Sequence, residues 1–198
     1  MSDQYMKNLT FENIAKACEG EYIGDEALLS DRIKGAVIDS RLVEEGYLFI
    51  PVKGEKVDGH KFIPDVFQKG AAIVLSEKKL EDPAGPYVLV DSTTEAMKKL
   101  AAFYRKSLDI KVVGITGSVG KTTTREMIAA ALSARYHVYK TPGNSNSQVG
   151  VPITVSEITK ADEVGVLELG MSEPGELTVI ARIAKPDVAV ITNIGITH

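Results

Sequence analysis

The chain has 198 residues, of which 44% are hydrophobic and 25% charged, a composition typical of a soluble globular protein. Its formal net charge of −4 argues against a nucleic-acid partner, because no basic surface is available to collect phosphates. The one cysteine, Cys18, excludes an internal disulfide framework. With no apolar run of membrane-spanning length, a cytoplasmic protein without membrane insertion is expected.

Residues 1–107 are expected to form a small N-terminal α/β domain. Thr10 is predicted to cap a helix that ends at Gly20, since apolar residues follow Thr10 at helical spacing. The capping box at residues 92–95 opens a longer helix. The other expected elements are a helix after the turn at 58–60 and strands at 36–38, 47–52, 71–75 and 87–90.

Residues 108–198 have the pattern of a doubly wound α/β domain. Apolar strands at 111–113, 138–139, 164–167 and 188–191 alternate with helical segments, which predicts a mostly parallel sheet covered on both faces. The helix that begins near Lys121 is expected to bury Met127, Ile128, Ala131 and Leu132. Because the chain stops at His198, directly after a strand and its loop, we expect a fragment whose second domain is truncated on its C-terminal side.

The central motif is the stretch GITGSVGKTTT at residues 114–124, between a β-branched strand and an amphipathic helix. Its glycines allow a tight turn whose N–H groups point at phosphate oxygens, and the helix N-terminus adds positive charge. Lys121 would then reach the terminal phosphates, and the Thr122 hydroxyl would coordinate Mg²⁺. The first glycine is Gly114 instead of residue 115, so this is a variant phosphate-binding loop. We predict that it binds a nucleoside triphosphate; the flanking elements disfavour a glycine-rich turn with an incidental lysine.

Two further polar residues follow the later strands, at the edge of the sheet where a ligand is expected. Glu168 ends an apolar strand, and we interpret it as a Mg²⁺ ligand, the alternative being a structural carboxylate that caps a neighbouring helix. His198 has the same relative place after the next strand. Position alone favours an ordinary surface or core histidine there.

The residues of two polar segments, 39–41 and 141–147, allow more than one interpretation. By residue type alone, Asn144 and Asn146 are turn formers with positive φ. Ser40 and Arg41 follow a strand and are able to hold a phosphate or a sugar. A local ion pair between Asp39 and Arg41 is an equal alternative.

Taken together, four ordered motifs resemble the Mur ligase family, the ATP-dependent ligases that build the peptidoglycan stem peptide. They are DSR at 39–41 with GYLF at 46–49, GITGSVGKTT at 114–123, TPGNSN at 141–146 with GVP at 150–152, and ELGMS at 168–172 with TNIGITH at 192–198. Within the family they are most similar to the members that add D-alanyl-D-alanine to UDP-N-acetylmuramoyl-tripeptide. The resemblance covers nearly the whole chain.

The resemblance implies an α/β UDP-substrate domain at 1–107, a P-loop ATPase domain at 108–198, and ATP and Mg²⁺ as cofactors. It makes Lys121, Glu168 and His198 catalytic, and Thr122, Glu168 and His198 metal ligands. The cofactor-binding residues would be Thr116, Gly117, Ser118, Val119, Gly120, Lys121, Thr122 and Thr123. The substrate-binding residues would be Ser40 and Arg41 for the uridine diphosphate, and Thr141, Asn144 and Asn146 in the catalytic cleft. The implied partners are UDP-N-acetylmuramoyl-tripeptide and D-alanyl-D-alanine, and the implied oligomeric state is a monomer.

Some positions depart from the family pattern, and other functions remain open. Val119 stands where the family commonly has a polar residue, and Ser145 and Ser147 replace bulkier or amide residues. The alternatives are another ligase of the superfamily (the third-residue, folate or cyanophycin enzyme), a non-catalytic nucleotide-dependent switch, or a bare UDP-sugar-binding module. As a fragment, the chain by itself is not expected to ligate.

Overall fold

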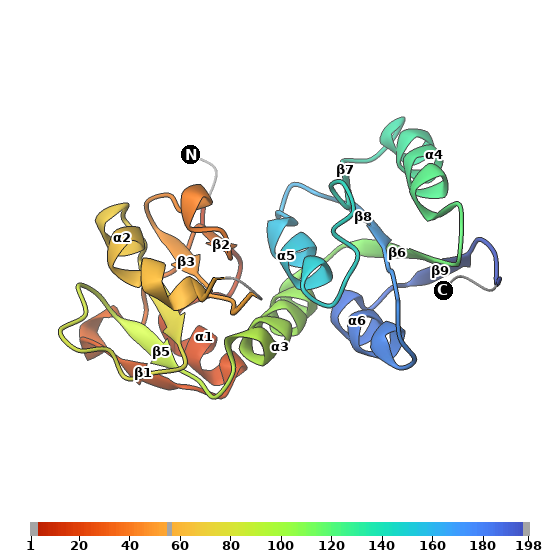
Figure 1. Cartoon of the computed structure of the whole chain (residues 1–198). Helices are drawn as coiled ribbons and strands as arrows, with labels where there is room; N and C mark the ends of the chain where they lie inside the picture. Colours follow the sequence, from red (N-terminus) through yellow and green to blue (C-terminus); the bar gives the residue numbers. More distant parts are fainter. Residues whose placement is uncertain (1–3, 55–56, 196–198) are drawn as a thin grey trace. The chain divides into compact units, whose positions relative to one another are not determined.

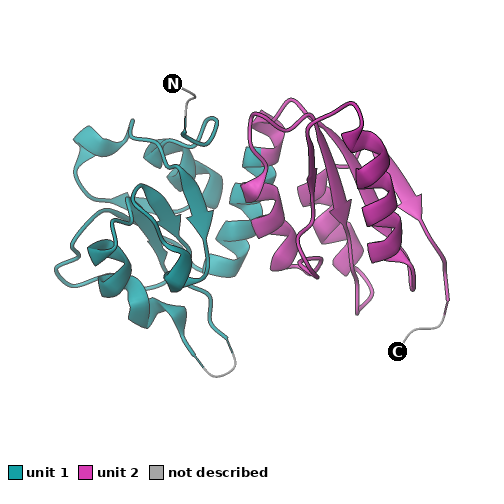
Figure 2. Ribbon diagram, turned by 90° about the horizontal axis from the view of Figure 1, so that it is seen from above, with its two compact units in different colours: residues 1–104 teal, residues 105–198 magenta. Residues whose placement is uncertain are grey.

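The computed structural model describes residues 4–54 and 57–195 and divides into two compact units, residues 1–104 and 105–198 (Figures 1 and 2). Each unit has its own sheet. The division falls within helix α3 (Thr93–Ser107), and the boundary expected from the sequence, residue 107, is the last residue of that helix.

In unit 1, the described residues form a five-stranded sheet in the order β1-β5-β4-β3-β2. Strand β1 is antiparallel to β5, and the other neighbours are parallel. The strands are β1 (Glu21–Ile23), β2 (Gly35–Val37), β3 (Tyr47–Phe49), β4 (Ile73–Ser76) and β5 (Tyr87–Leu89). The helices are α1 (Phe11–Cys18), α2 (Ile63–Gln68) and α3, with 3₁₀ turns η1 (Glu26–Leu28), η2 (Ser40–Leu42) and η3 (Gly59–Phe62).

Helix α1 begins where its N-cap was expected but ends differently. The Thr10 hydroxyl accepts a hydrogen bond from the Asn13 amide at 3.1 Å. The left-handed residue that ends the helix is Glu19, at φ 54°, and not Gly20. Gly20 is needed for another reason: a Cβ there would lie 2.5 Å from a methyl of Val88 and 2.7 Å from the Leu89 carbonyl oxygen on β5. The glycine therefore allows close approach to the sheet.

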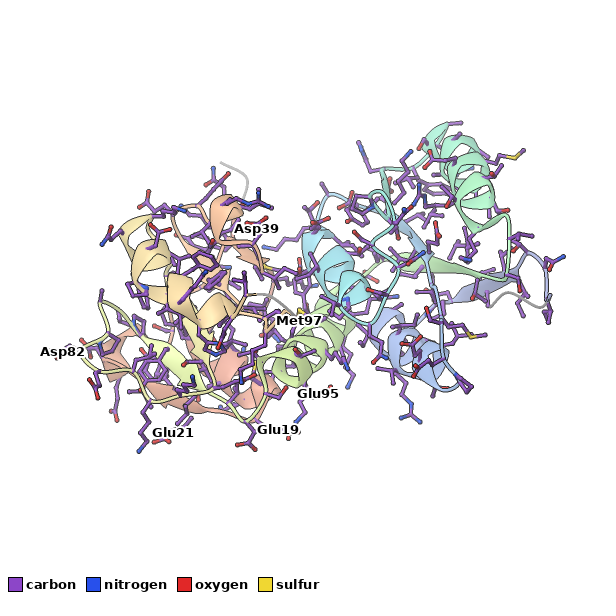
Figure 3. The ribbon with its side chains drawn as sticks, viewed as in Figure 1. Glu19, Glu21, Asp39, Asp82, Glu95 and Met97 are labelled. Atoms are coloured by element: carbon purple, nitrogen blue, oxygen red, sulfur yellow. The ribbon has the colours of Figure 1, made fainter. Side chains whose placement is uncertain are left out.

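The core of unit 1 packs helix residues against the middle of the sheet. Phe49 and Val74, on β3 and β4, contact Ile63 and Val66 of α2, and all four are buried. Met97, which Figure 3 labels on α3, belongs to the core as well and is 2% exposed. Cys18 is buried on α1, and burial raises the pKa of its thiol to about 12.

In unit 2, the described residues form a parallel four-stranded sheet in the order β7-β8-β6-β9. Its strands are β6 (Lys111–Thr116), β7 (Val138–Lys140), β8 (Val164–Glu168) and β9 (Val188–Ile191). Helix α4 (Lys121–Ser133) lies on one face, and α5 (Gly150–Glu157) and α6 (Glu176–Ala184) lie on the other (Figures 1 and 2). The expected α/β class with mostly parallel sheets is confirmed.

Two expectations about burial in unit 2 are wrong. Strand β9 is largely exposed, because it lies at the sheet edge, whereas β8 in the interior is buried along its whole length. On α4, Met127 is 69% exposed and Ala131 is exposed as well. The helix instead turns Arg125 and Ala129 inward. Ile128 and Leu132, also expected to be buried, are partly buried against the core, so periodicity identified only part of the face that packs on the sheet.

None of the described helices combines the length and the apolar character needed to cross a bilayer.

Candidate functional site

The glycine-rich loop joins the carboxyl end of β6 to the first turn of α4, as a phosphate-binding loop requires. Gly117 has φ 135° and Gly120 has φ 83°, backbone conformations that side chains rarely adopt. A Cβ on Gly117 would also overlap the Thr192 hydroxyl and lie 2.9 Å from the Asn193 carbonyl oxygen. The loop thus depends on glycine at position 117 for both conformation and space.

The loop is held by the segment that follows the neighbouring strand β9. The Thr192 hydroxyl donates to the Val119 carbonyl at 2.6 Å, and the Ser118 amide donates to the Asn193 carbonyl at 2.9 Å. The Ser118 side chain is bonded to the backbone of Gly195. These contacts place residues 192–195 beside the loop. His198 itself lies outside the described residues.

Lys121 occupies the first position of α4, and its ammonium turns back over the loop. Its Nζ donates to the Gly117 carbonyl at 2.7 Å. Positive charge at a helix N-terminus, above backbone N–H groups, is the arrangement that binds polyphosphate. Thr116, Gly117, Ser118, Val119, Gly120, Thr122 and Thr123 surround this lysine in sequence and form the rest of the loop and the first turn.

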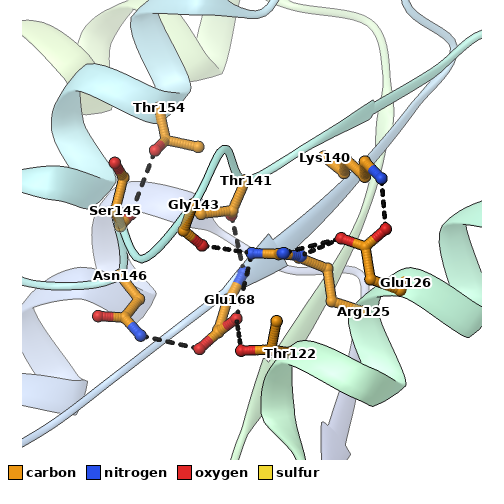
Figure 4. Close-up of polar contacts among 10 residues, drawn as sticks. All are labelled: Thr122, Arg125, Glu126, Lys140, Thr141, Gly143, Ser145, Asn146, Thr154 and Glu168. Carbon is orange, nitrogen blue, oxygen red and sulfur yellow. Dashed lines mark hydrogen bonds and ion pairs between the residues drawn. The ribbon is translucent and has the colours of Figure 1, made fainter.

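Glu168 is the centre of a buried polar network at the end of β8 (Figure 4). Its side chain is almost fully enclosed, the residue being 2% exposed. One carboxylate oxygen, Oε2, accepts from the Thr122 hydroxyl at 3.1 Å, and the other, Oε1, accepts from the Asn146 amide at 2.8 Å. The Glu168 backbone N–H donates to the Thr141 hydroxyl at 2.9 Å. Four residues predicted separately from the sequence therefore meet here.

Arg125 is a member of this network that the sequence reasoning missed. It is 5% exposed, and its Nη1 donates to Glu168 Oε2 at 3.3 Å and to the Gly143 carbonyl at 2.7 Å. The other side of the guanidinium is bonded to Glu126. A signal for it existed: Arg125 lies three residues after Thr122, so both project from the same side of α4.

The oxygen atoms at this point fit a hard divalent cation. Thr122 Oγ1 and Glu168 Oε2 are 3.1 Å apart. Two adjacent ligands of an octahedral Mg²⁺, each about 2.1 Å from the ion, are separated by about 3 Å. Among the described residues, no three His, Cys, Asp or Glu side chains gather into a metal cluster. Mg²⁺ at nucleotide sites needs only one or two protein ligands besides phosphates and water.

The loop at residues 141–147 corrects one interpretation. Neither Asn144 nor Asn146 has positive φ; the left-handed residue of the loop is Gly143, at φ 52°. The side-chain amide of Asn146 points at Glu168. Asn144 is exposed, and its backbone carbonyl accepts from the backbone N–H of Asn146 at 2.8 Å. Asn146 is thus part of the network and Asn144 is not.

In unit 1, the residues considered for a phosphate or sugar make local contacts. The Arg41 guanidinium pairs with the Asp39 carboxylate at 2.6 Å, and the Arg41 side chain is 85% exposed. Hydrogen bonds from the Arg41 side chain and backbone lower the pKa of Asp39 from 3.8 to about 2. Ser40 is buried, and its carbonyl accepts from Lys69 at 3.0 Å. The ion pair considered as an alternative is present.

Comparison with known proteins finds a family match in each of the two units. Residues 115–198 match the family model described as "Mur ligase middle domain", and residues 32–105 match "Mur ligase family, catalytic domain". The chain belongs to the Mur ligase family. Together the two matches account for most of this Mur ligase chain, including the glycine-rich loop from residue 115 onward and the Asp39–Arg41 motif.

Its relatives carry a more specific name. The UDP-N-acetylmuramoyl-tripeptide--D-alanyl-D-alanine ligase of Bacillus subtilis (strain 168) is 43% identical over 191 residues, which are 96% of this chain and 42% of that ligase. A crystal structure of MurF from Acinetobacter baumannii superposes with a TM-score of 0.87 at 34% identity, over 96% of this chain and 41% of that one. MurF ligase from Thermotoga maritima, solved in complex with ADP, gives a TM-score of 0.74 at 39% identity, covering 81% and 38%. This Mur ligase chain therefore spans less than half the length of these relatives.

Proposed function

We propose that the chain belongs to a ligase that joins D-alanyl-D-alanine to UDP-N-acetylmuramoyl-tripeptide at the expense of ATP, releasing ADP and phosphate. The matched part contributes ATP binding through unit 2 and binding of the uridine nucleotide through unit 1. Because the chain spans 42% of the Bacillus relative, ligation is proposed for the whole enzyme and binding for this chain. We further propose a cytoplasmic location, where ATP is available, and a monomer on the family resemblance alone.

One observation carries the proposal: Lys121 and Thr122 of a glycine-rich loop stand beside a buried acid from the adjacent strand. The Thr122 hydroxyl bonds to Glu168, and strands β6 and β8 pair in parallel with Ile115 opposite Glu168. Phosphate-binding loops beside a strand-end acid are the arrangement that nucleotide-hydrolysing and phosphoryl-transfer proteins use for Mg·ATP. The Thermotoga relative with bound ADP supports the same assignment.

Each residue of the site has a proposed role. The loop from Thr116 to Thr123 cradles the phosphates with its backbone N–H groups, and Lys121 neutralises the charge of the transferred phosphoryl group. Thr122 and Glu168 would hold Mg²⁺, with His198 as a further proposed ligand. When bound, Mg²⁺ supplies Lewis-acid stabilisation of the phosphoryl oxygens.

The proposed chemistry is acyl activation. A free carboxylate is a poor electrophile, because its leaving group would be oxide. Transfer of the γ-phosphoryl group to the tripeptide carboxylate forms an acyl phosphate and ADP. The amine of D-alanyl-D-alanine then attacks the acyl carbon and loses a proton, and inorganic phosphate leaves as the amide bond forms. Lys121 would stabilise negative charge on the phosphoryl group through both steps.

We propose that the acceptor approaches from the loop at residues 141–147. Thr141 and Asn146 are already bonded to Glu168, and Asn144 is exposed beside them. Ser40 and Arg41 are proposed to bind the uridine diphosphate. The Arg41 side chain is exposed and positively charged, although Asp39 occupies one edge of its guanidinium. Binding of the diphosphate would have to share the guanidinium with that carboxylate.

Calorimetry with this chain tests the proposal directly. We expect ADP to bind in the presence of Mg²⁺ and UDP-N-acetylmuramoyl-tripeptide to bind independently of nucleotide. Absence of heat with ADP would overturn the ATP-site assignment. Equal binding of the acceptor that lacks its third residue would favour the third-residue ligase instead.

A further inference from the structure

We propose that Arg125 is a positioning residue for the metal-binding acid: it is the resident counter-ion of Glu168 and shares the Oε2 oxygen with Mg²⁺. The inference deepens the proposed function and rests on the proposed Mg²⁺ site. It concerns how the carboxylate is held when the ion is absent and what the ion must compete with when it binds.

Burial is the first reason to assign this role. Arg125 and Glu168 are 5% and 2% exposed, so each charge is removed from water. A buried carboxylate is costly unless a cation and hydrogen-bond donors compensate it. Of the described side chains that donate to this carboxylate, Thr122 and Asn146 are neutral. Arg125 supplies the positive charge, through Nη1 at 3.3 Å.

The second reason is that the guanidinium and the proposed ion meet the same oxygen. Thr122 Oγ1 and Arg125 Nη1 both bond to Oε2, and Thr122 is the other proposed metal ligand. Two cations that share one anionic partner repel each other, so each weakens the binding of the other. The positive charge of Arg125 should therefore raise the Mg²⁺ concentration that the site requires.

The third reason is that Arg125 is anchored elsewhere and can loosen its hold on Glu168 without losing its partners. Nη1 is closer to the Gly143 carbonyl, at 2.7 Å, than to the carboxylate. Nε and Nη2 both donate to Glu126, at 3.1 Å and 2.7 Å (Figure 4). The contact with Glu168 is thus the longest of the polar contacts seen for this guanidinium, and the one that bound Mg²⁺ would weaken.

The test compares Arg125→Met with Arg125→Lys, which keeps the charge, and with Arg182→Met, which removes an exposed charge from α6 in the same unit. Thermal unfolding of the chain is measured with EDTA and with increasing MgCl₂ at constant ionic strength, without nucleotide. Arg125→Met should be less stable in EDTA and should gain stability from Mg²⁺, because the ion replaces the missing charge. The wild type, Arg182→Met and Arg125→Lys should respond little.

A second measurement uses ADP. The Mg²⁺ concentration at half-maximal ADP binding should be about tenfold lower for Arg125→Met than for the wild type, a usual size for two coupled ligands. It should be unchanged for Arg182→Met. A role in packing alone would lower stability and leave this midpoint where it is.

The outcomes separate the two proposals. An Arg125→Met variant whose stability responds to Mg²⁺ no more than that of Arg182→Met overturns the inference, and so does an unchanged midpoint in a variant that still binds ADP. If Arg125→Met does not fold in EDTA, Mg²⁺ or the added change Glu168→Gln should restore folding, and failure of both contradicts it. If the wild type binds no ADP, the proposed function fails, while the unfolding experiment still decides the role of Arg125.

Discussion

At the scale of single residues, the site depends on charges whose partners the chain itself provides. Lys121 lies against the Gly117 carbonyl, and Glu168 has donors on both carboxylate oxygens. Each functional group is therefore oriented by hydrogen bonds, which limits the rearrangement needed when a ligand arrives. A substitution should therefore have different effects at a residue proposed to bind phosphate and at a residue that only supports the fold.

Lys121→Ala should weaken binding of ADP in the presence of Mg²⁺ by about 2 kcal/mol, or roughly thirtyfold, because a charge-assisted hydrogen bond to phosphate is lost. Lys106→Ala removes an exposed lysine from α3 and should leave the affinity unchanged. Calorimetry measures both. In the proposed whole ligase, Lys121→Ala should abolish ATP-dependent turnover, and activity within about tenfold of the wild type would contradict the proposed role of Lys121 in phosphoryl transfer.

The Asp39–Arg41 pair predicts a pH dependence in the acid range. The folded pKa of Asp39, about 2, is below its ordinary value of 3.8, so ionised Asp39 stabilises the folded state above pH 4. This contribution is lost as the pH falls from about 4 toward 2, and it is small because the pair is exposed. Asp39→Asn should therefore reduce the difference in stability between pH 5 and pH 2. Urea unfolding at the two pH values measures it; an identical difference in wild type and variant would refute the assignment.

At the scale of elements, the sequence is most constrained in the glycine-rich turn and on the faces of α4. The glycine-rich loop requires glycine at position 117, because the segment after β9 leaves no room for a side chain. Helix α4 contributes Lys121, Thr122 and Arg125 to the site from its first two turns, while Ile128, Ala129 and Leu132 pack against the sheet. In the proposed function, the loop and the helix would act together as one ligand-binding element.

Gly117→Ala should remove detectable ADP binding while leaving unit 1 folded. The added methyl group would collide with Thr192 and the residue would have to adopt φ 135°, so the loop must change shape. Gly165→Ala, on β8 of the same unit, is the matched control, since a Cβ there meets its neighbours at ordinary distances of 3.5 Å or more. Calorimetry reports binding, and circular dichroism reports folding. Retention of wild-type affinity by Gly117→Ala would show that the loop does not bind phosphate in this conformation.

The two helical methionines provide a test of which faces are buried. Met97 of α3 is 2% exposed, and Met127 of α4 is 69% exposed. Met97→Ala should lower the free energy of unfolding by about 2–5 kcal/mol, because it leaves a cavity in a packed core. Met127→Ala should change it by less than about 0.5 kcal/mol. Urea denaturation of the two variants measures both changes. Comparable losses in the free energy of unfolding would mean that the Met127 face is covered in solution.

At the scale of the whole molecule, the two units have separate sheets and separate cores. Each unit also has its own proposed ligand, the uridine nucleotide for unit 1 and ATP for unit 2. A ligand stabilises the part of a protein that binds it, by about 2.7 kcal/mol when its concentration is a hundred times its dissociation constant.

ADP with Mg²⁺ should therefore increase amide-exchange protection in β6 to β9 and α4, and leave β1 to β5 nearly unchanged. UDP-N-acetylmuramoyl-tripeptide should instead increase protection in β1 to β5 and leave β6 to β9 and α4 nearly unchanged. Hydrogen exchange read by mass spectrometry, with each ligand alone, measures both. Protection by ADP confined to unit 1 would contradict the assignment of the ATP site.

Local patterns in the sequence were sufficient for most of the elements and for the family, although β1 was not predicted. Thr10, the glycine-rich loop and the strand ending at Glu168 were predicted because caps, turns and apolar strands depend on neighbouring residues. The long-range choices were different. That α4 turns Arg125 inward and Met127 outward, that β9 lies exposed at an edge, and that Asn146 meets Glu168 depend on which elements pack together. Such contacts join residues far apart in the chain. Helical spacing placed Arg125 on the same side of α4 as Thr122, but only the tertiary structure showed that the end of β8 meets that side, with the guanidinium beside Glu168.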